Sequence, residues 1–484
     1  MLNPQEKRDA VAFERHLYVD LDGTLLRGDS LHEACLKLVA CPSSWPAVLR
    51  ALFSGKAVFK RAVAAQASLL AEALPYRHDF LEWLRAQRIS GRRLILATGA
   101  DRTIASAVAN HLGIFDEVLA SDGRVNLTGI NKLKAIEAHA GGGHFAYAGD
   151  GSVDLPIWAA ASSVVLVGPG LRYEQTIGSA KVEARFADSV NTVAAVFRSL
   201  RPHQWAKNIL VFLPAAAAHR LLEPAVLQAD VLLFAAFSLC ASGVYAANDL
   251  LDLESDRGHV SKRRRPLASG AVTIPLGVGI ACVLPLLALA LAFVGAGWPG
   301  LMMIAGYWVA TSYYSLHGKR VPLLDVFLLA GFYTFRAYAG ALVIPAGLSA
   351  WMVAFLLFLF LGLACLKRFS ELLALPEEHQ GSVLGRGYRR ADHYLMAMLG
   401  VGAGFAATLV VCLYAAAPSA ASLYAQPMAV MGVAPLVLFG LTRLWLQAWR
   451  GELHSDPVLH ALRDKASYLL IALCILGVMA ASWL

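Results

Sequence analysis

Residues 248–256 read NDLLDLESD and place four acidic side chains and one amide at the end of a long apolar run. A carboxylate at that depth destabilises the chain unless it has a partner. In helical geometry Asn248, Asp252 and Asp256 would stack on one face, with Asp249 beside them. Like charges so close would repel each other, whereas Mg²⁺ accepts carboxylate and amide oxygens. The segment therefore predicts a Mg²⁺ site formed by these four residues, for a phosphorylated substrate.

The composition predicts a membrane protein with a soluble front end. The chain has 484 residues, of which 57% are hydrophobic and 16% charged, which is too apolar for an ordinary soluble protein. Residues 1–195 resemble a soluble α/β domain, and residues 196–484 are dominated by apolar runs. The net charge of +8 lies mostly in loops between these runs, which favours membrane topology and anionic substrates over nucleic acid. The seven cysteines lack metal-site spacing and are expected to be small buried hydrophobes.

Four ordered motifs in the first domain indicate phosphoryl chemistry. A short apolar strand runs into DLDGTLL at 20–26, and LILATG at 94–99 is a second strand that ends near Thr98. GINK at 129–132 and AYAGDGSVD at 146–154 follow. Together they resemble the haloacid dehalogenase-like (HAD) phosphatases. That resemblance implies a Rossmann-type α/β fold with a helical cap.

The resemblance also implies roles for the acidic residues. Asp20 would be the nucleophile that forms an aspartyl-phosphate, and Asp22 would protonate the leaving alkoxide and then activate water. Asp20 and Asp150 would hold Mg²⁺, with Asp154 as a supporting ligand. Asp22 is also among the expected metal ligands.

The same resemblance implies two phosphate-binding residues and a cap. Thr98 and Lys132 would bind the transferring phosphoryl oxygens, and the spacing from Gly129 favours Lys132 over Lys134. The Ala- and Leu-rich segment 31–70 would form the cap. Its basic and aromatic side chains could face a lipid headgroup, but an ordinary amphipathic cap is the favoured interpretation.

The second half predicts about nine membrane spans, from windows of roughly twenty apolar residues. Those windows lie near 205–219, 226–248, 273–294, 298–316, 322–343, 349–366, 393–416, 427–448 and 466–484. Pro214 interrupts the first window.

Loops rich in Lys and Arg alternate with loops that are nearly free of charge. By the positive-inside rule the basic loops and the first domain lie in the cytoplasm, with the chain in the plasma membrane and Arg220 the exception. The basic positions are Lys262–Arg265, Lys319, Arg320, Lys367, Arg368, Arg386, Arg389, Arg390, Arg450 and Arg463.

The acidic stretch and the basic segment KRRRPLASG at 262–270 are similar to the intramembrane UbiA-like prenyltransferase superfamily. The resemblance implies an all-α membrane domain of nine helices around a central cavity. A second acidic motif is usual there, but the corresponding segment YYSLHGKRVPLLD at 313–325 keeps a single Asp. This departure disfavours a prenyl diphosphate donor, which needs two acid clusters.

Further segments resemble the polyprenyl-phosphate phosphoribosyltransferase branch of this superfamily. They are RPHQWAKN at 201–208, DVFLLAGFYTFRAYAG at 325–340, LKRFSEL at 366–372 and RGYR at 386–389. The resemblance implies that phosphoribosyl pyrophosphate is the donor and a polyprenyl phosphate, such as decaprenyl phosphate, the acceptor.

In this branch the acidic motif would hold the metal-bound pyrophosphate, with Asp249, Asp252 and Asp256 as catalytic residues. Arg336 lies in an apolar span, so it is expected either to face the cavity or to pair with a buried acid such as Asp325. The expected substrate-binding set in this half is Lys207, Asn248, Lys262, Arg263, Arg265, Tyr314, Lys319, Asp325, Arg336, Lys367 and Arg389.

The two halves together predict a bifunctional, Mg²⁺-dependent enzyme in which phosphoribosyl transfer precedes removal of the 5-phosphate. The product would be polyprenyl-phosphoryl-ribose, a precursor of an arabinose donor for the cell envelope. An aromatic prenyltransferase with an attached phosphatase is the main alternative, and a transporter or anchor that carries a phosphatase is another. Isoprenoid length and homo-oligomerisation are left open.

Overall fold

A computed structural model shows two compact units. One comprises residues 1–199 together with 246–279, and the other residues 200–245 together with 280–484. The structure describes residues 16–483 except 40, 189–190, 346, 377–385, 454–455 and 462–463. The prediction for Arg463 therefore lies outside the described residues.

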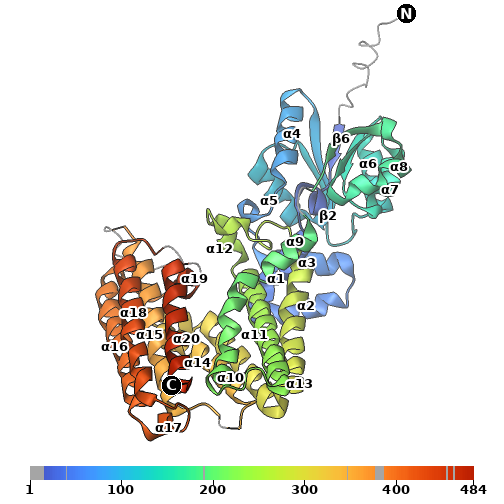
Figure 1. Cartoon of the computed structure of the whole chain (residues 1–484). Coiled ribbons are helices and arrows are strands. Elements are labelled where there is room, and N and C mark those ends of the chain that lie inside the picture. Colours follow the sequence, from blue (N-terminus) through green and yellow to red (C-terminus); the bar gives the residue numbers. More distant parts are fainter. Residues whose placement is uncertain are drawn as a thin grey trace, which may run out of the picture. The chain divides into compact units, whose positions relative to one another are not determined.

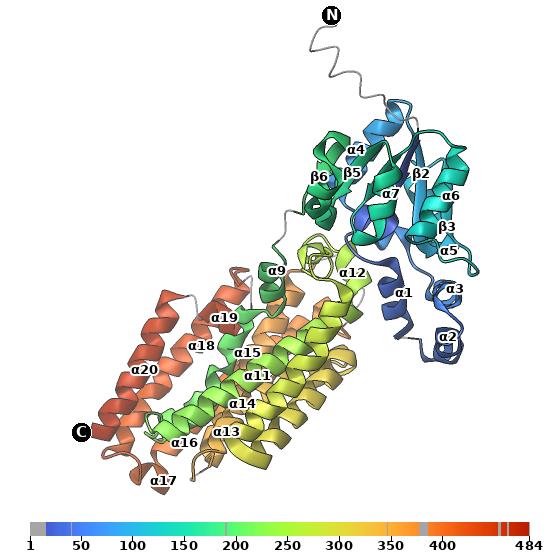
Figure 2. The same ribbon diagram turned by 90° about the vertical axis from the view of Figure 1, so that its right-hand side faces the viewer.

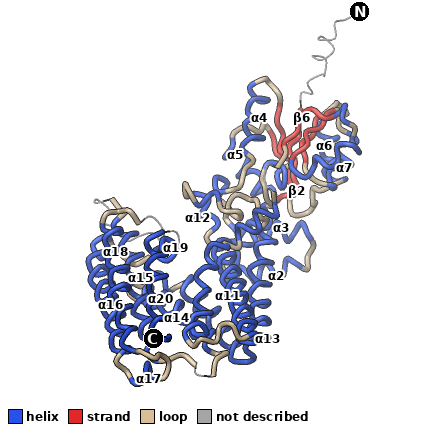
Figure 3. Tube along the Cα trace, in the orientation of Figure 1, coloured by secondary structure: helices blue, strands red, loops and turns tan. Residues whose placement is uncertain are grey.

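The first unit is built on a six-stranded parallel sheet with strand order β3-β2-β1-β4-β5-β6 (Figures 1 and 3). This order confirms the predicted α/β fold. The strands are β1 (His16–Val19), β2 (Arg93–Asp101), β3 (Glu117–Ser121), β4 (Ala146–Gly149), β5 (Ser163–Val167) and β6 (Val182–Phe186).

Both faces of the sheet are buried, as a parallel sheet requires. Side chains alternate along each strand, so Leu17 and Val19 pack on one face and Tyr18 on the other. Figure 1 shows α4 and α5 on one side of the sheet and α6 to α8 on the other. The helices of this unit are α1 (Ser30–Val39), α2 (Trp45–Leu52), α3 (Lys56–Ala67), α4 (His78–Ile89), α5 (Arg102–Leu112), α6 (Ile130–Ala140), α7 (Leu155–Ala160), α8 (Glu174–Ile177), α9 (Thr192–Ser199) and α12 (Leu253–Gly258).

Helices α1, α2 and α3 form the insertion between the first two strands. The expected cap segment 31–70 is therefore helical. Lys60 donates to the Gly99 carbonyl oxygen at 2.6 Å, and Arg61 donates to the Asp122 carbonyl oxygen at 2.7 Å. Both side chains bind the α/β domain itself, which favours the ordinary cap over the lipid-facing alternative for these two residues.

The second unit consists of long helices, and Figures 1 and 2 show α16, α18 and α20 side by side. Helix α11 begins in this unit and ends in the first. The helices are α10 (Leu213–Ala217), α11 (Pro224–Leu251), α13 (Ile274–Leu316), α14 (Leu324–Ala341), α15 (Ala350–Leu373), α16 (His393–Ala415), α17 (Pro418–Ala421), α18 (Val433–Trp449), α19 (Pro457–Ala461) and α20 (Lys465–Trp483).

Six helical segments in the described part of the chain are long and apolar enough to cross a membrane, so the expected count of nine spans is not confirmed. Two of the expected spans lie in the 43-residue α13, whose backbone is non-helical at Ala296 and Gly297. Helix α14 matches another expected span but is outside the six. These apolar helices indicate that the chain is an integral membrane protein.

The expected first span, 205–219, is wrong as a continuous helix. A 3₁₀ helix over Pro202–Phe212 and the short α10 replace it. Proline at 202 and at 214 favours these breaks, because each proline starts a helical segment. This 3₁₀ helix packs closely on α14, since a Cβ on Gly340 would lie 1.7 Å from the Val211 carbonyl oxygen.

Candidate active sites

The phosphatase motifs converge at the carboxyl ends of β1 and β4, which are neighbours in the sheet. Asp20 directly follows β1 and Asp150 directly follows β4. Their carboxylates and that of Asp154 have ligand atoms within 4.8 Å of one another, and in the described part of the chain this is the one group of its kind. The structure therefore brings these three predicted residues together, and Asp20 and Asp150 meet because the parallel strands before them end on the same edge.

Lys132 enters this acidic group from α6. Its Nζ lies 2.8 Å from Asp20 Oδ2 and 3.7 Å from Asp154 Oδ1, and it donates to the Tyr147 hydroxyl at 2.9 Å. Tyr147 in turn donates to Asp154 at 2.7 Å. Lys132 is 3% exposed whereas Lys134 is exposed, so the geometry agrees with the choice made from spacing.

Gly23 allows the chain to pass close to Asp150. Its φ is +74°, and a Cβ at this position would lie 2.2 Å from Asp150 Oδ2. Thr24, the next residue, donates its hydroxyl to Asp150 Oδ1 at 3.2 Å. The DLDGT turn thus holds the second carboxylate beside the first.

The carboxyl groups at this edge have raised affinities for protons. Burial raises the pKa of Asp150 to about 7, with the carboxylates of Asp20 and Asp154 adding to the shift. Burial also raises the pKa of Asp20, which Lys132 opposes. Burial alone would lower the pKa of Lys132, but Asp20 and Asp154 hold it above its ordinary value. A further cation would relieve the remaining repulsion between the acids.

Asp22 lies outside the three-carboxylate group. Its Oδ1 accepts the Ser30 backbone N–H at 2.7 Å, at the start of α1. Burial raises its pKa to about 7, and the Asp29 carboxylate adds to the shift. This value suits an acid and base, whereas its expected role as a metal ligand finds no geometric support here.

Thr98 lies fully buried on β2, and its hydroxyl accepts the Ala100 N–H at 3.0 Å. Its expected role in binding phosphoryl oxygens stays a prediction.

The acidic motif of the membrane half spans two consecutive helices with a break between them. Helix α11 ends at Leu251, Asp252 occupies the N-cap position of α12 without a side-chain capping bond, and α12 holds Asp256. The N–H groups of Asp252 and Asp256 still donate four residues back, at 2.9 and 2.8 Å. The four predicted ligands thus keep an approximate stack across a break.

Protein cations already lie against this motif. Arg265 Nη1 bonds with Asp249 at 3.0 Å and with Asp256 at 2.6 Å, and Lys262 Nζ lies 3.9 Å from Asp256. Asp249 and Asp256 are both buried. Arg265 therefore neutralises two of the acids expected to bind Mg²⁺, and Mg²⁺ binding at this motif stays a prediction. Arg263 lies in the same basic turn.

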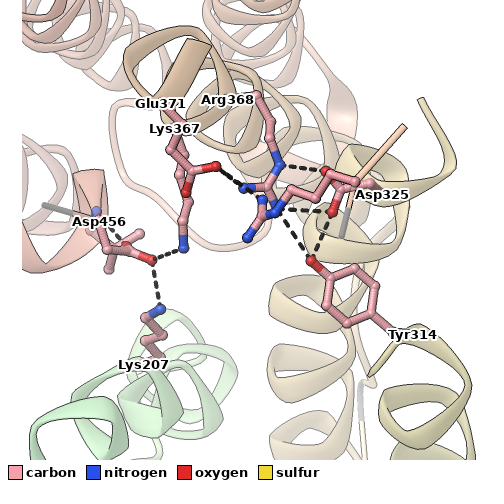
Figure 4. A network of polar contacts seen from close by, with 9 residues as sticks. Lys207, Tyr314, Asp325, Lys367, Arg368, Glu371 and Asp456 are labelled. Carbon is pink, nitrogen blue, oxygen red and sulfur yellow. Dashed lines mark hydrogen bonds and ion pairs between the residues drawn. The ribbon is translucent and has the colours of Figure 1, made fainter. Parts of the chain in front are cut away.

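A polar network occupies the second unit (Figure 4). Asp456 accepts from Lys207 at 2.8 Å and from Lys367 at 2.9 Å. Burial would raise the pKa of Asp456, but the two lysines hold it below its usual range. Lys367 and Asp456 also line a cavity of about 530 Å³. Two cations share one carboxylate, which leaves positive charge beside a cavity.

Asp325 belongs to a second part of the same network. It bonds with the Arg368 guanidinium through both carboxylate oxygens and accepts the Tyr314 hydroxyl at 2.7 Å. Arg368 and Lys367 lie in the last turns of α15, so the expectation that they are loop residues is wrong. Lys319 lies in the turn before α14, and the Arg389 backbone N–H donates to the Asp392 carboxylate at 2.7 Å at the start of a short 3₁₀ helix.

Arg336 does not pair with Asp325, and that alternative is wrong. Its guanidinium donates to Asn208 at 2.7 Å, to the Tyr307 hydroxyl at 2.7 Å and to the Phe332 carbonyl oxygen at 2.6 Å. It also lies over the rings of Phe237, Tyr307 and Tyr333. The aromatic and amide environment explains how a buried arginine is tolerated here.

Reasoning from the sequence missed a set of arginines beside the phosphatase site. Arg77 bonds with Asp188 and with the Gly23 carbonyl oxygen, and Arg257 forms a two-bond ion pair with Glu33 at 2.6 and 3.1 Å. These partners are far apart along the chain, and no motif spacing links them.

Mg²⁺ fits the phosphatase site by the chemistry of its donors. Asp20, Asp150 and Asp154 supply hard oxygen ligands that lie within 4.8 Å of one another, and burial together with the neighbouring carboxylates raises the pKa of Asp20 and of Asp150. A divalent cation there would be held by these three carboxylates.

Comparisons with known proteins agree with both halves. Residues 17–158 match the model of the haloacid dehalogenase-like hydrolases, and residues 208–462 match that of the UbiA prenyltransferase family. The uncharacterized protein y4nM of Sinorhizobium fredii is 36% identical over 97% of this chain and 92% of its own length. The nodulation protein NoeC of Azorhizobium caulinodans is 34% identical over 57% of this chain and 88% of its own length.

A third relative carries a specific activity in its name. The decaprenyl-phosphate phosphoribosyltransferase of Mycobacterium tuberculosis is 35% identical over 187 residues, which are 38% of this chain and 61% of that protein. The match to the UbiA family model covers more than half of this chain. The chain belongs to the UbiA prenyltransferase family, with a haloacid dehalogenase-like hydrolase domain fused at its front.

Proposed function

We propose that this protein makes a lipid-linked ribose in two steps. It transfers 5-phosphoribose from phosphoribosyl pyrophosphate to a polyprenyl phosphate such as decaprenyl phosphate, and it then removes the 5-phosphate. One observation carries the proposal. The motifs of a haloacid dehalogenase-like hydrolase, with Lys132 against Asp20, lie in the same chain as a segment that is 35% identical to a decaprenyl-phosphate phosphoribosyltransferase. The product would serve as a precursor of an arabinose donor for the cell envelope.

In the first step the ribose C1–O bond to pyrophosphate breaks, and C1 becomes oxocarbenium-like. A phosphate oxygen of the lipid attacks C1 from the opposite face and forms the new C1–O bond. The donor is a polyanion, so it requires several cations around it. Lys207 and Lys367, which both pair with Asp456, support this assignment, as does the cavity that Lys367 and Asp456 line.

In the second step a carboxylate oxygen of Asp20 attacks the 5-phosphate and forms an aspartyl-phosphate. Asp22 donates its proton to the leaving alkoxide and later takes a proton from the attacking water. Lys132 neutralises charge on the phosphoryl oxygens from its place 2.8 Å from Asp20. Mg²⁺, when bound by Asp20, Asp150 and Asp154, supplies positive charge to the same oxygens.

Fusion in one chain raises the local concentration of the lipid intermediate at the second site. The product of the first step carries a phosphomonoester, which is the group that the second site would hydrolyse. This order explains why both activities would lie in one polypeptide.

Radiolabelled phosphoribosyl pyrophosphate and polyprenyl phosphate, incubated with membranes with and without Mg²⁺, test the proposal after lipid extraction. Asp20→Asn should accumulate the 5-phosphorylated lipid, and Asp252→Asn should abolish ribosyl transfer but retain hydrolysis of a soluble phosphate ester. Loss of both activities in both variants would contradict the division of labour. Release of pyrophosphate from a prenyl diphosphate, and not from phosphoribosyl pyrophosphate, would contradict the first step.

A further inference from the structure

The first unit contains a cavity of about 530 Å³ beside the phosphatase acids. Asp22 and Asp150 line it on one side. Another part of the lining comes from Leu267 and residues 270–276, which belong to the transferase sequence and lie in the same unit as the phosphatase domain. The cavity is therefore completed by both parts of the chain.

Two of the three arginines that line this cavity are neutralised by acids. Arg77 is paired with Asp188. Arg257 is paired with Glu33 and also donates to the carbonyl oxygens of Ala268 at 3.0 Å and Ala73 at 3.1 Å. These two guanidinium groups hold the walls together, and their hydrogen-bonding capacity is largely used.

The third arginine, Arg27, has a different environment. Its Nε is buried and has no hydrogen-bond partner among the described residues, and no carboxylate of that part of the chain lies within ion-pair distance of it. The nearby Asp29 is engaged elsewhere, because it accepts the Leu31 N–H at 2.8 Å and lies 3.9 Å from His32. Arg27 is thus a guanidinium with unused donors that lines the cavity.

The transferase wall of the cavity is apolar. It includes Leu267, Val272, Ile274 and Leu276. Ile274 is the first residue of α13, one of the helices able to cross a membrane. A ligand at this wall would lie beside the start of a membrane helix.

We propose that Arg27 is a specificity-determining residue of the phosphatase. It binds a second anionic group of the substrate, while the phosphomonoester lies at Asp20. The substrate class is a sugar phosphate whose other end carries a phosphodiester to a membrane lipid. The inference deepens the proposed function and rests on it for the identity of that lipid. A guanidinium recognises a phosphate through two parallel hydrogen bonds, which a neutral side chain cannot replace.

The test uses the full chain and two soluble esters. Ribose 1,5-bisphosphate carries a second anionic group at C1, and ribose 5-phosphate does not. The protein should prefer the bisphosphate, with ribose 1-phosphate as product, by about tenfold or more in kcat/KM, mainly through KM, as one charge-assisted hydrogen bond provides. Arg27→Gln should lower this preference to about one, which is the value without that bond.

Arg85→Gln is the matched control, because Arg85 is an exposed arginine of α4 outside the cavity. It should keep the full preference. Arg27→Lys retains the charge but loses the fork of donors, so its preference should fall between those of the natural protein and Arg27→Gln. An undiminished preference in Arg27→Gln, or in Arg27→Lys if Arg27→Gln does not fold, would overturn the proposal. Equal turnover of both esters by the natural protein would also overturn it.

These outcomes are separate from those of the proposed function. The ester assay needs neither phosphoribosyl pyrophosphate nor a lipid acceptor, so it reports on Arg27 even if ribosyl transfer is absent. An Arg27-dependent preference without ribosyl transfer would keep the anionic subsite and contradict the proposed first step.

Discussion

Lys132 combines a structural and a chemical role in one buried ammonium group. It is 3% exposed and contacts Asp20, Asp154 and Tyr147. An unpaired charge at that depth would be strongly destabilising, so the buried ammonium group requires its two carboxylate partners. The same partners hold its proton, because they keep its pKa above the ordinary value. The cation is therefore fixed where phosphoryl charge would develop.

Lys132→Gln should lower phosphatase kcat by about 10²–10³-fold, the range for loss of one preorganised electrostatic group. The exposed Lys134 offers a matched control two residues away, and Lys134→Gln should leave the rate within about twofold, as expected of a surface change. Steady-state hydrolysis of a soluble phosphate ester measures both variants. Equal losses in the two lysine variants would show that Lys132 has no special role.

At the level of residues, the site residues that lie in sequence motifs could be predicted. Contacts between residues that only the fold brings together could not. Asp20 and Asp150 could be found because each directly follows a buried strand. The Arg257–Glu33 pair could not be found, because the two residues are 224 positions apart. No sequence motif contains both of them. Arg336 was recognised as a buried cation, but its amide and aromatic partners depend on helix packing.

Among the elements, α14 and α15 are joined by a buried ion pair. Asp325 is fully buried, Arg368 is 2% exposed, and they bond through both carboxylate oxygens. Tyr314 adds a hydrogen bond to the same carboxylate. Asp325 was expected to bind substrate. That role stays a prediction, and its partners in the structure are those of a residue that holds two helices together.

Arg368→Met should therefore destabilise the protein by about 3–5 kcal/mol, because it leaves a buried carboxylate without its cation. The double variant Asp325→Leu/Arg368→Met removes both charges and should recover part of that loss. Arg443→Met, which breaks the partly exposed pair with Asp464, should cost about 1 kcal/mol or less. Thermal unfolding in detergent measures all three, and a loss for Arg368→Met no larger than that for Arg443→Met would contradict the structural role.

The prediction of whole elements from hydropathy succeeded for long uniform runs and failed where proline or backbone contact intervenes. Helices α11, α15, α16, α18 and α20 lie where apolar windows were expected. A span was also expected at 205–219, yet Pro202, Pro214 and the close approach of Val211 to Gly340 leave only short segments there. Hydropathy indicates whether a segment prefers an apolar environment. It does not indicate which backbone conformation the segment adopts there.

For the molecule as a whole, the distribution of charge predicts one orientation in the membrane. Basic residues gather at one set of loops and helix ends, whereas the segments 295–300, 345–349 and 418–426 carry none. The positive-inside rule places the basic set, and with it the phosphatase domain, in the cytoplasm. Phosphoribosyl pyrophosphate is soluble and strongly charged, so a cytoplasmic donor site also accords with the proposed function.

Natural and introduced cysteines can test this orientation. Cys41 is exposed in the phosphatase unit, and Ser422 is exposed in the weakly charged loop after α17. A membrane-impermeant maleimide should label Cys41 only after the cells are opened. In a Cys41→Ser background, Ser422→Cys should be labelled in intact cells, and the Cys41→Ser protein alone supplies the background signal. Labelling of Cys41 in intact cells would reverse the orientation and place the phosphatase away from a cytoplasmic donor, because the soluble domain and the basic loops must share one side.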